Sequence, residues 1–188
     1  FSGAKFVPVD YNIFPAGFNN LSEESIAIGS RNIQRYLQRF FPNVHHIGLI
    51  TEYHTRNQFY QLNVECIVKI IENAGYKVST APLTEGVTID EDLPSTSFIT
   101  NNQGRIAINN TCVDLVLLNN DLSAGFPALL TDAVTPVIPS TKLGWYIREK
   151  SQYFTEHQKI IIEFCTEFAL DPFYLTSNFL VYNGLNFQ

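Results

Sequence analysis

The chain has 188 residues, of which 45% are hydrophobic and 16% charged, so it can fill a core and general disorder is excluded. Its formal net charge is −6, which argues against nucleic acid or an anionic membrane as the main partner, because both need a cationic face. There is no apolar run near 18 residues, so the sequence predicts no membrane span.

The first elements predicted along the chain are a strand and a capped helix. Lys5–Val9 reads as a short strand, and Ser22 has the character of a helix N-cap. The helix after Ser22 carries one apolar face, made by Ile26, Ile33, Tyr36, Leu37 and Phe40.

A second strand and helix follow. Ile47–Ile50 reads as a buried strand, Thr55–Gln58 matches a capping box, and Gly75 is placed as the residue that ends the helix. The apolar face of this helix is predicted to hold Phe59, Leu62, Cys66, Ile70 and Ala74.

The remaining elements are predicted from short apolar runs. Strands are expected at Tyr76–Thr80, Val113–Leu118 and Thr135–Pro139, with a β-hairpin excursion around residues 84–111. One long helix is expected over residues 142–169, with an apolar stripe at Leu143, Ile147, Phe154, Ile161, Cys165 and Phe168. Alternating strands and helices predict an α/β fold with a largely parallel sheet flanked by helices, as a single domain over residues 1–188.

Three polar clusters each follow a predicted strand directly: Asp10–Asn20, Glu52–Asn57 and Asn119–Gly125. If these strands are parallel, the clusters meet at the carboxyl edge of the sheet, where open α/β sheets bind ligands. The alternative is that their Asn and Gly residues simply form turns.

The residue types in these clusters suit a small polar ligand. Arg56 stands at a predicted helix N-terminus, where it and the backbone N–H groups favour an anion. Lys150 and Ser151 interrupt the apolar stripe of the last helix; either Lys150 reaches solvent or it meets an anion, with Arg148 nearby. Side-chain amides that offer donors and an acceptor are Asn12, Asn19, Asn20, Asn57, Asn119 and Asn120.

The residues alone predict no catalytic machinery. The four His residues have no metal-ligand spacing, and no nucleophile elbow, Walker loop or G-x-G-x-x-G motif occurs. Three widely spaced cysteines read as free thiols, with Cys66 and Cys165 expected to be buried, which fits the reducing cytosol better than secretion.

Four segments carry a resemblance to a known family: DYNIFPAGFNNL (10–21), EYHTRNQFYQLNV (52–64), LLNNDLSAGFP (117–127) and LGWYIREKSQYF (143–154). They resemble proteobacterial glutamate–cysteine ligases, ATP-grasp enzymes that form γ-glutamylcysteine in glutathione biosynthesis. The resemblance covers most of the chain, and residues 84–111 carry little of it.

The resemblance implies that residues 1–188 are the N-terminal, substrate-side α/β domain of a cytoplasmic ligase. The ATP-grasp module, which would bind ATP and Mg²⁺, is expected beyond residue 188, so this segment alone is expected to be inactive. The abrupt C-terminus and the absence of Met fit a piece of a longer protein.

The resemblance also implies small-molecule substrates, L-glutamate and L-cysteine, and allows a homo-oligomer. The residues expected to shape the amino-acid pocket are Asn12, Asn19, Asn20, Arg56, Asn57, Asn119, Asn120, Asp121, Ser123, Arg148, Lys150 and Ser151.

Two alternatives stay open. The same edge could belong to a stand-alone, non-catalytic module that binds an amino acid or a dicarboxylate, or the chain could be a docking domain whose polar loops are only turns.

Overall fold

A four-stranded parallel sheet forms the centre of residues 12–146, one of two units into which the chain divides; the other holds residues 1–11 and 147–188. The computed structural model describes residues 14, 16–52, 58–82, 98–100, 104–108, 111–123, 125–131, 133–144, 147 and 150–176. Each unit is described by itself.

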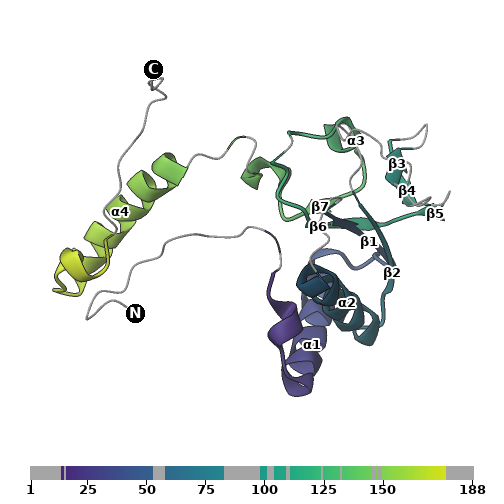
Figure 1. Cartoon of the computed structure of the whole chain (residues 1–188), viewed down its shortest axis with the longest axis horizontal. Coiled ribbons are helices and arrows are strands. Elements are labelled where there is room, and N and C mark those ends of the chain that lie inside the picture. Colours follow the sequence, from purple (N-terminus) through teal and green to yellow (C-terminus); the bar gives the residue numbers. More distant parts are fainter. Residues whose placement is uncertain are drawn as a thin grey trace. The chain divides into compact units, whose positions relative to one another are not determined.

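The strand order in the sheet is β2-β1-β6-β7, and every neighbouring pair is parallel (Figure 1). β1 (His46–Thr51) lies between β2 (Lys77–Pro82) and β6 (Leu115–Asn119), and β7 (Val137–Ile138) forms the far edge. All six residues of β1 are buried, as expected for a central strand that is covered on both faces. The predicted α/β class with a largely parallel sheet is confirmed.

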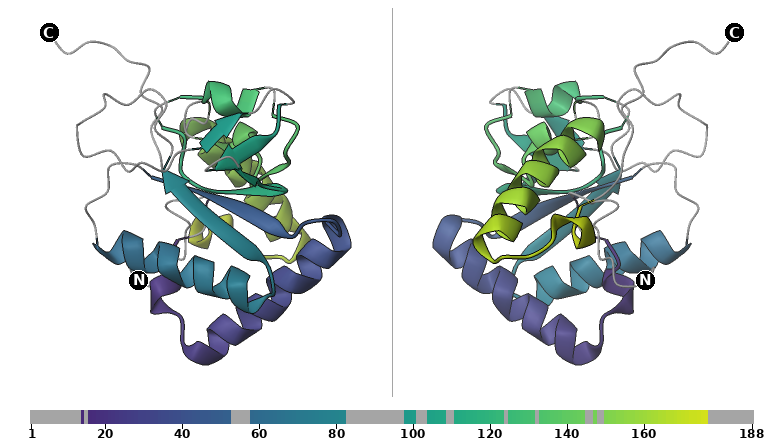
Figure 2. Two further views of the ribbon diagram at one scale, coloured as in Figure 1. Left: turned by 90° about the vertical axis from the view of Figure 1, so that its right-hand side faces the viewer. Right: turned by 90° about the vertical axis from the view of Figure 1, so that its left-hand side faces the viewer.

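Two long helices cover one face of this sheet. α1 (Glu23–Phe40) and α2 (Gln58–Asn73) lie together on one side (Figure 2). The short 3-10 turn η1 (Phe18–Asn20) packs against α2. The core of this layer consists of Leu37, Val44, Ile47, Leu49, Ile67, Ile71 and Leu115.

The opposite face is covered by a small antiparallel sheet and a short helix. β3 (Phe98–Thr100), β4 (Ile106–Ile108) and β5 (Thr111–Cys112) pair in that order, which confirms the predicted hairpin excursion. α3 (Ala128–Thr131) completes the layer. A second apolar core lies here and includes Ile50, Ala81, Ile106, Ile108, Val116, Leu118, Leu122 and Leu130.

The helix ends follow the predicted capping chemistry. The hydroxyl of Ser22 accepts the N–H of Ser25, so Ser22 is the N-cap of α1. α2 ends in a Schellman motif, in which Tyr76 N–H donates to Ile71 C=O and Gly75 N–H donates to Glu72 C=O. Gly75 has a φ of 90°, which is the left-handed conformation that this motif requires.

Parts of the predicted helix faces are wrong. In α2, Phe59 and Leu62 are 61% and 48% exposed. The buried positions there are Asn63, Ile67, Ile70 and Ile71. The buried face is displaced because Asn63 turns inward, where its side-chain oxygen accepts the N–H of Phe18 at 2.8 Å. In α1, Tyr36 and Phe40 are likewise exposed.

The predicted helix over residues 142–169 is too long. α4 spans Lys150–Glu167, and residues Thr141–Leu143 form a separate 3-10 turn, η2, capped by the Ser140 hydroxyl. This turn ends at Gly144, whose extended backbone (ψ 152°) is incompatible with a helix. Leu143 and Ile147 of the predicted stripe are therefore outside α4, and both are exposed.

α4 ends at Glu167, shortly before Ala169 takes up a φ of 51°. Asp171 then caps the 3-10 turn η3 (Pro172–Tyr174). No helix in the described part of the chain is long and apolar enough to cross a membrane.

All three cysteines are free; Cys165 is buried as predicted, whereas Cys66 is only half-buried. The predicted strand Lys5–Val9 and most of the capping box at Thr55–Gln58 lie outside the described residues.

Two Gly→Ala substitutions test the helix assignments in opposite directions. Gly29 lies inside α1, where an added Cβ would be 3.5 Å from Ile70, an ordinary contact. We expect Gly29→Ala to raise the free energy of unfolding by about 0.5–1 kcal/mol, because Ala restricts the unfolded chain more than Gly does. Gly75→Ala should lower it by about 1 kcal/mol, because its left-handed φ disfavours any Cβ. Urea unfolding followed by circular dichroism measures both, and two shifts of the same sign would contradict the assignment.

Candidate functional site

The strand order changes direction between β1 and β6, because β2 and β6 lie on opposite sides of β1. From β1 the chain passes through α2 to β2 on one side, and it later returns to place β6 on the other side of β1. The carboxyl ends of these two strands lie next to each other, with Thr51 paired with Asn119. Such a switch point leaves a crevice outside the strand ends, and it is where open α/β sheets bind ligands.

Two of the three predicted polar clusters meet at this switch point. Glu52, the residue after β1, accepts the backbone N–H of Asp121 at 2.8 Å through Oε1 and the Asn120 amide at 3.2 Å through Oε2. The same Asn120 amide also donates to the carbonyl of Thr51 at 3.3 Å. The carboxylate of Glu52 therefore holds the segment after β6 against the end of β1.

The hydroxyl of Tyr60 joins three elements at the same place. Tyr60 lies in the first turn of α2; its oxygen accepts the N–H of Glu52 at 2.8 Å, and its O–H donates to the carbonyl of Asn119 at 2.7 Å. Backbone groups at the ends of β1 and β6 are thereby paired through one side chain of the following helix. This arrangement makes the strand ends rigid just where the loops begin.

The loop after β6 is anchored by its own side chains. Asn120 Oδ1 accepts the N–H of Leu122, and Asp121 Oδ1 accepts the N–H of Ser123, each at 2.8 Å. Leu122 adopts a φ of 56° although it is not glycine, and its side chain is only 2% exposed. The apolar anchor and the two side-chain turns hold this strained backbone in place.

The described part of the site is electronegative. It contains the carboxylates of Glu52 and Asp121, the second of which lies partly exposed in the loop. Burial raises the pKa of the Tyr60 hydroxyl to about 12. The hydrogen bond from the Glu52 N–H lowers this pKa, whereas the negative charges of Glu52 and Asp121 raise it further. Tyr60 is thus a neutral hydrogen-bonding group, and the two carboxylates favour a cationic group such as an ammonium.

The predicted site residues divide into three sets. Those brought together at the switch point are Asn119, Asn120, Asp121 and Ser123. Asn19 and Asn20 lie on η1, where the Asn19 amide donates to Asn20, and Ser151 lies in α4, in the other unit. Asn12, Arg56, Asn57 and Arg148 fall outside the described residues, as does the side chain of Lys150.

The residues predicted to shape the pocket include neither Tyr60 nor Glu52, although Glu52 begins one of the three predicted polar clusters. A tyrosine in the first turn of a helix that follows a buried strand is close to the carboxyl edge, and this position was the available signal. The position of Tyr60 is hard to recognise as functional because Tyr60 lies next to Phe59, which the sequence pattern places on an apolar face. The described residues include no group of three or more His, Cys, Asp or Glu side chains that could hold a metal ion.

The fold and this site define an α/β domain of the switch-point class, with a polar, carboxylate-containing edge suited to a small ligand. The glutamate–cysteine ligase family model, GshA, matches residues 1–188. The chain therefore belongs to the glutamate–cysteine ligase family.

A solved structure has a similar fold. A crystal structure described as a "putative gamma-glutamylcysteine synthetase" from Methylobacillus flagellatus KT is similar with a TM-score of 0.77 and 30% sequence identity. The similarity covers 92% of this chain and 42% of that chain, so the present chain spans less than half the length of this relative. No curated protein matches the sequence.

Tyr60→Phe tests the hydroxyl that joins the strand ends. The substitution leaves the Glu52 N–H and the Asn119 C=O without this partner in a partly buried place. We expect the free energy of unfolding to fall by about 1–3 kcal/mol. Tyr36→Phe, at a 45% exposed position of α1, is the matched control and should change it by no more than about 0.5 kcal/mol. Equal effects of the two variants in urea unfolding would refute the role given to Tyr60.

The raised pKa of Tyr60 predicts a late step in alkaline titration. Its folded-state pKa of about 12 lies above the ordinary tyrosine value of 10.0. The stability that Tyr60 contributes is therefore fully present below the unfolded pKa and is lost as the pH rises through the folded pKa. In an ultraviolet titration of tyrosinate formation, the native wild type should show a step near the higher value that Tyr60→Phe lacks. Superimposable curves would show that this hydroxyl is not shielded.

Proposed function

We propose that this chain is the N-terminal, substrate-side domain of an ATP-dependent glutamate–cysteine ligase. The observation that carries the proposal is the meeting of Glu52 with Asn120 and Asp121 at the switch point of a member of this family. The greater length of the Methylobacillus relative supports a further module in the whole protein.

In this proposal the domain positions amino-acid substrates rather than ATP. ATP would supply the phosphoryl group that activates the glutamate γ-carboxylate, and the cysteine amine would then displace phosphate. ATP and Mg²⁺ would bind mainly in an ATP-grasp portion beyond residue 188. Such a ligase would work in the cytoplasm, and its catalysis would depend largely on holding the reacting groups in position.

The charges at the edge suggest how an amino acid would be oriented. The carboxylates of Glu52 and Asp121 would attract the α-ammonium group. Asn119 and Asn120, which are buried at the end of β6, would help to hold these carboxylates in place. Arg56 would hold a substrate carboxylate in a bidentate pair. Asn12, Asn19, Asn20, Asn57 and Ser123 would complete the pocket, and the substrate contacts expected for Arg148, Lys150 and Ser151 stay predictions from the family resemblance.

The reaction is tested on the intact polypeptide as the organism makes it. Its mass is measured first, and phosphate release is then followed with ATP, L-glutamate and L-cysteine, together and with each omitted. We expect a mass well above 21.3 kDa and release that needs all three compounds. A mass near that value with no release would exclude a ligase in this chain and favour the stand-alone amino-acid binder.

Glu52→Gln in the active polypeptide tests the pocket. The amide keeps an oxygen for the Asp121 N–H but removes the charge that would face the ammonium. We expect the KM for one amino-acid substrate to rise about tenfold or more, since a lost charge pair in such a site is worth a few kcal/mol. Arg56→Ala should likewise raise the KM for glutamate.

Glu72→Gln, at an exposed position of α2, is the matched control and should leave all three KM values unchanged. If Glu52→Gln and Arg56→Ala behaved like this control, the substrate pocket would lie elsewhere in the protein.

A further inference from the structure

A second candidate binding site lies at the opposite, amino end of the parallel strands. A cavity of about 360 Å³ opens there between the end of α1, the hairpin and the segments that lead into β6 and β7. Its volume lies in the range of small-molecule sites. It is lined by Phe40, Phe41, Pro42, Asn43, Val44, Arg105, Val113, Asp114, Val134, Thr135 and Pro136.

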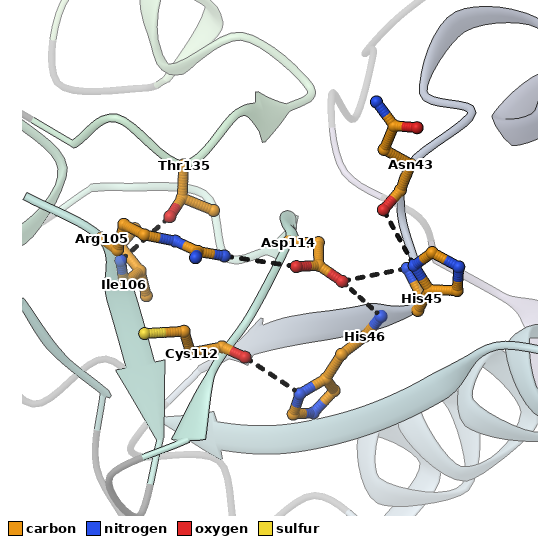
Figure 3. A network of polar contacts seen from close by, with 8 residues as sticks. All are labelled: Asn43, His45, His46, Arg105, Ile106, Cys112, Asp114 and Thr135. Carbon is orange, nitrogen blue, oxygen red and sulfur yellow. Dashed lines mark hydrogen bonds and ion pairs between the residues drawn. The ribbon is translucent and has the colours of Figure 1, made fainter.

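Asp114 organises the polar wall of this cavity (Figure 3). Its Oδ2 accepts the backbone N–H groups of His45 and His46, each at 3.0 Å, and its Oδ1 meets Arg105 Nη2 at 3.3 Å. Burial alone would raise the pKa of Asp114, but the two N–H groups and the Arg105 guanidinium hold it below its ordinary value. Asp114 and Arg105 together carry no net charge, so an incoming anion would be bound by direct hydrogen bonds from the guanidinium rather than by a net positive field.

Two hydrogen bonds fix the backbone on either side of Arg105. The N–H of Ile106 donates to the Thr135 hydroxyl, and the N–H of Val134 donates to the carbonyl of Gly104, each at 2.9 Å. The guanidinium carries five N–H donors in a planar fork, and the side chain of Arg105 remains 43% exposed beside Asp114. A cation is thus fixed at the wall of the cavity while part of it stays accessible.

The other walls of the cavity are apolar and partly exposed. Phe40 is 55% exposed and Val134 is 71% exposed. Phe40 and Phe41 also lie around Tyr36, with ring centroids 4.9 Å and 6.1 Å from it. Exposed aromatic and aliphatic side chains around a concave space with a few placed polar groups, here Asn43, Arg105, Asp114 and Thr135, are the usual composition of a small-molecule pocket.

We propose that this cavity binds a small carboxylate with an apolar, preferably aromatic body. The carboxylate would pair with Arg105, and the body would lie against Phe40, Phe41 and Val134. The proposal does not depend on the function proposed above, since the cavity and the Glu52 cluster lie at opposite ends of β1 and β6.

The probe is 2-naphthoate, with the uncharged 2-naphthamide as its isostere, titrated into the whole chain by calorimetry. We expect saturable binding of the carboxylate with a Kd on the order of 1 mM or tighter. The amide should bind about tenfold more weakly, because it cannot form a charge-assisted pair with Arg105.

Three variants locate the site. Arg105→Met should weaken 2-naphthoate binding about tenfold. Val134→Asp should weaken it independently through like charge; since Val134 is 71% exposed, the fold should tolerate this change, and the Arg105–Asp114 pair is untouched. Arg35→Met, at an exposed α1 position outside the cavity, is the control and should bind as the wild type does.

Absence of saturable binding by the wild type would overturn the proposal. Equal binding of acid and amide would overturn it as well, because the cation would then contribute nothing. If Arg105→Met and Val134→Asp both kept wild-type affinity, the naphthoate would be bound elsewhere and the cavity would not be its site.

Discussion

The parallel pairing of β1 with β6 is the constraint on which the rest of residues 12–146 depends. β1 is buried along its whole length, so each of its faces needs a covering layer: α1 and α2 on one side, the hairpin and α3 on the other. Because β6 lies on the side of β1 away from β2, the carboxyl ends of β1 and β6 form a switch point, the place where open α/β sheets bind ligands. Glu52, Tyr60 and Asn120 then fix the beginning of both loops.

The framework could be predicted from the sequence because it rests on short-range signals. Runs such as Ile47–Ile50 and Leu115–Leu118, the second within the predicted strand Val113–Leu118, contain no polar side chain, which indicates strands covered on both faces. Ser22 and Gly75 mark helix ends by local chemistry. The buried face of α2 could not be read in the same way, because it presents apolar residues in more than one direction. Which of them is buried depends on α1 and on the bond between Asn63 and Phe18.

The candidate site was predictable only in part. Polar residues placed directly after two strands pointed to the carboxyl edge, and Asn119–Asp121 do meet Glu52 there. The contribution of Tyr60 depends on distances across three elements that no local pattern encodes. The cavity at the amino end of the strands could not be predicted from the sequence at all. Its lining residues Phe40, Arg105 and Val134 are far apart in the chain and become neighbours only through the tertiary fold.

The carboxylate of Asp114 has a consequence for how the sheet chooses its alignment. In a strand whose two faces are both apolar, hydrophobicity does not distinguish the correct alignment from one displaced by a single residue. The polar residues at the two ends of the β1–β6 pair do distinguish them. Asp114 accepts two successive N–H groups just before and at the start of β1, and Tyr60 bridges the far end. A displaced strand would lose both sets of bonds at once, so these few end residues would select a single register for the β1–β6 pair.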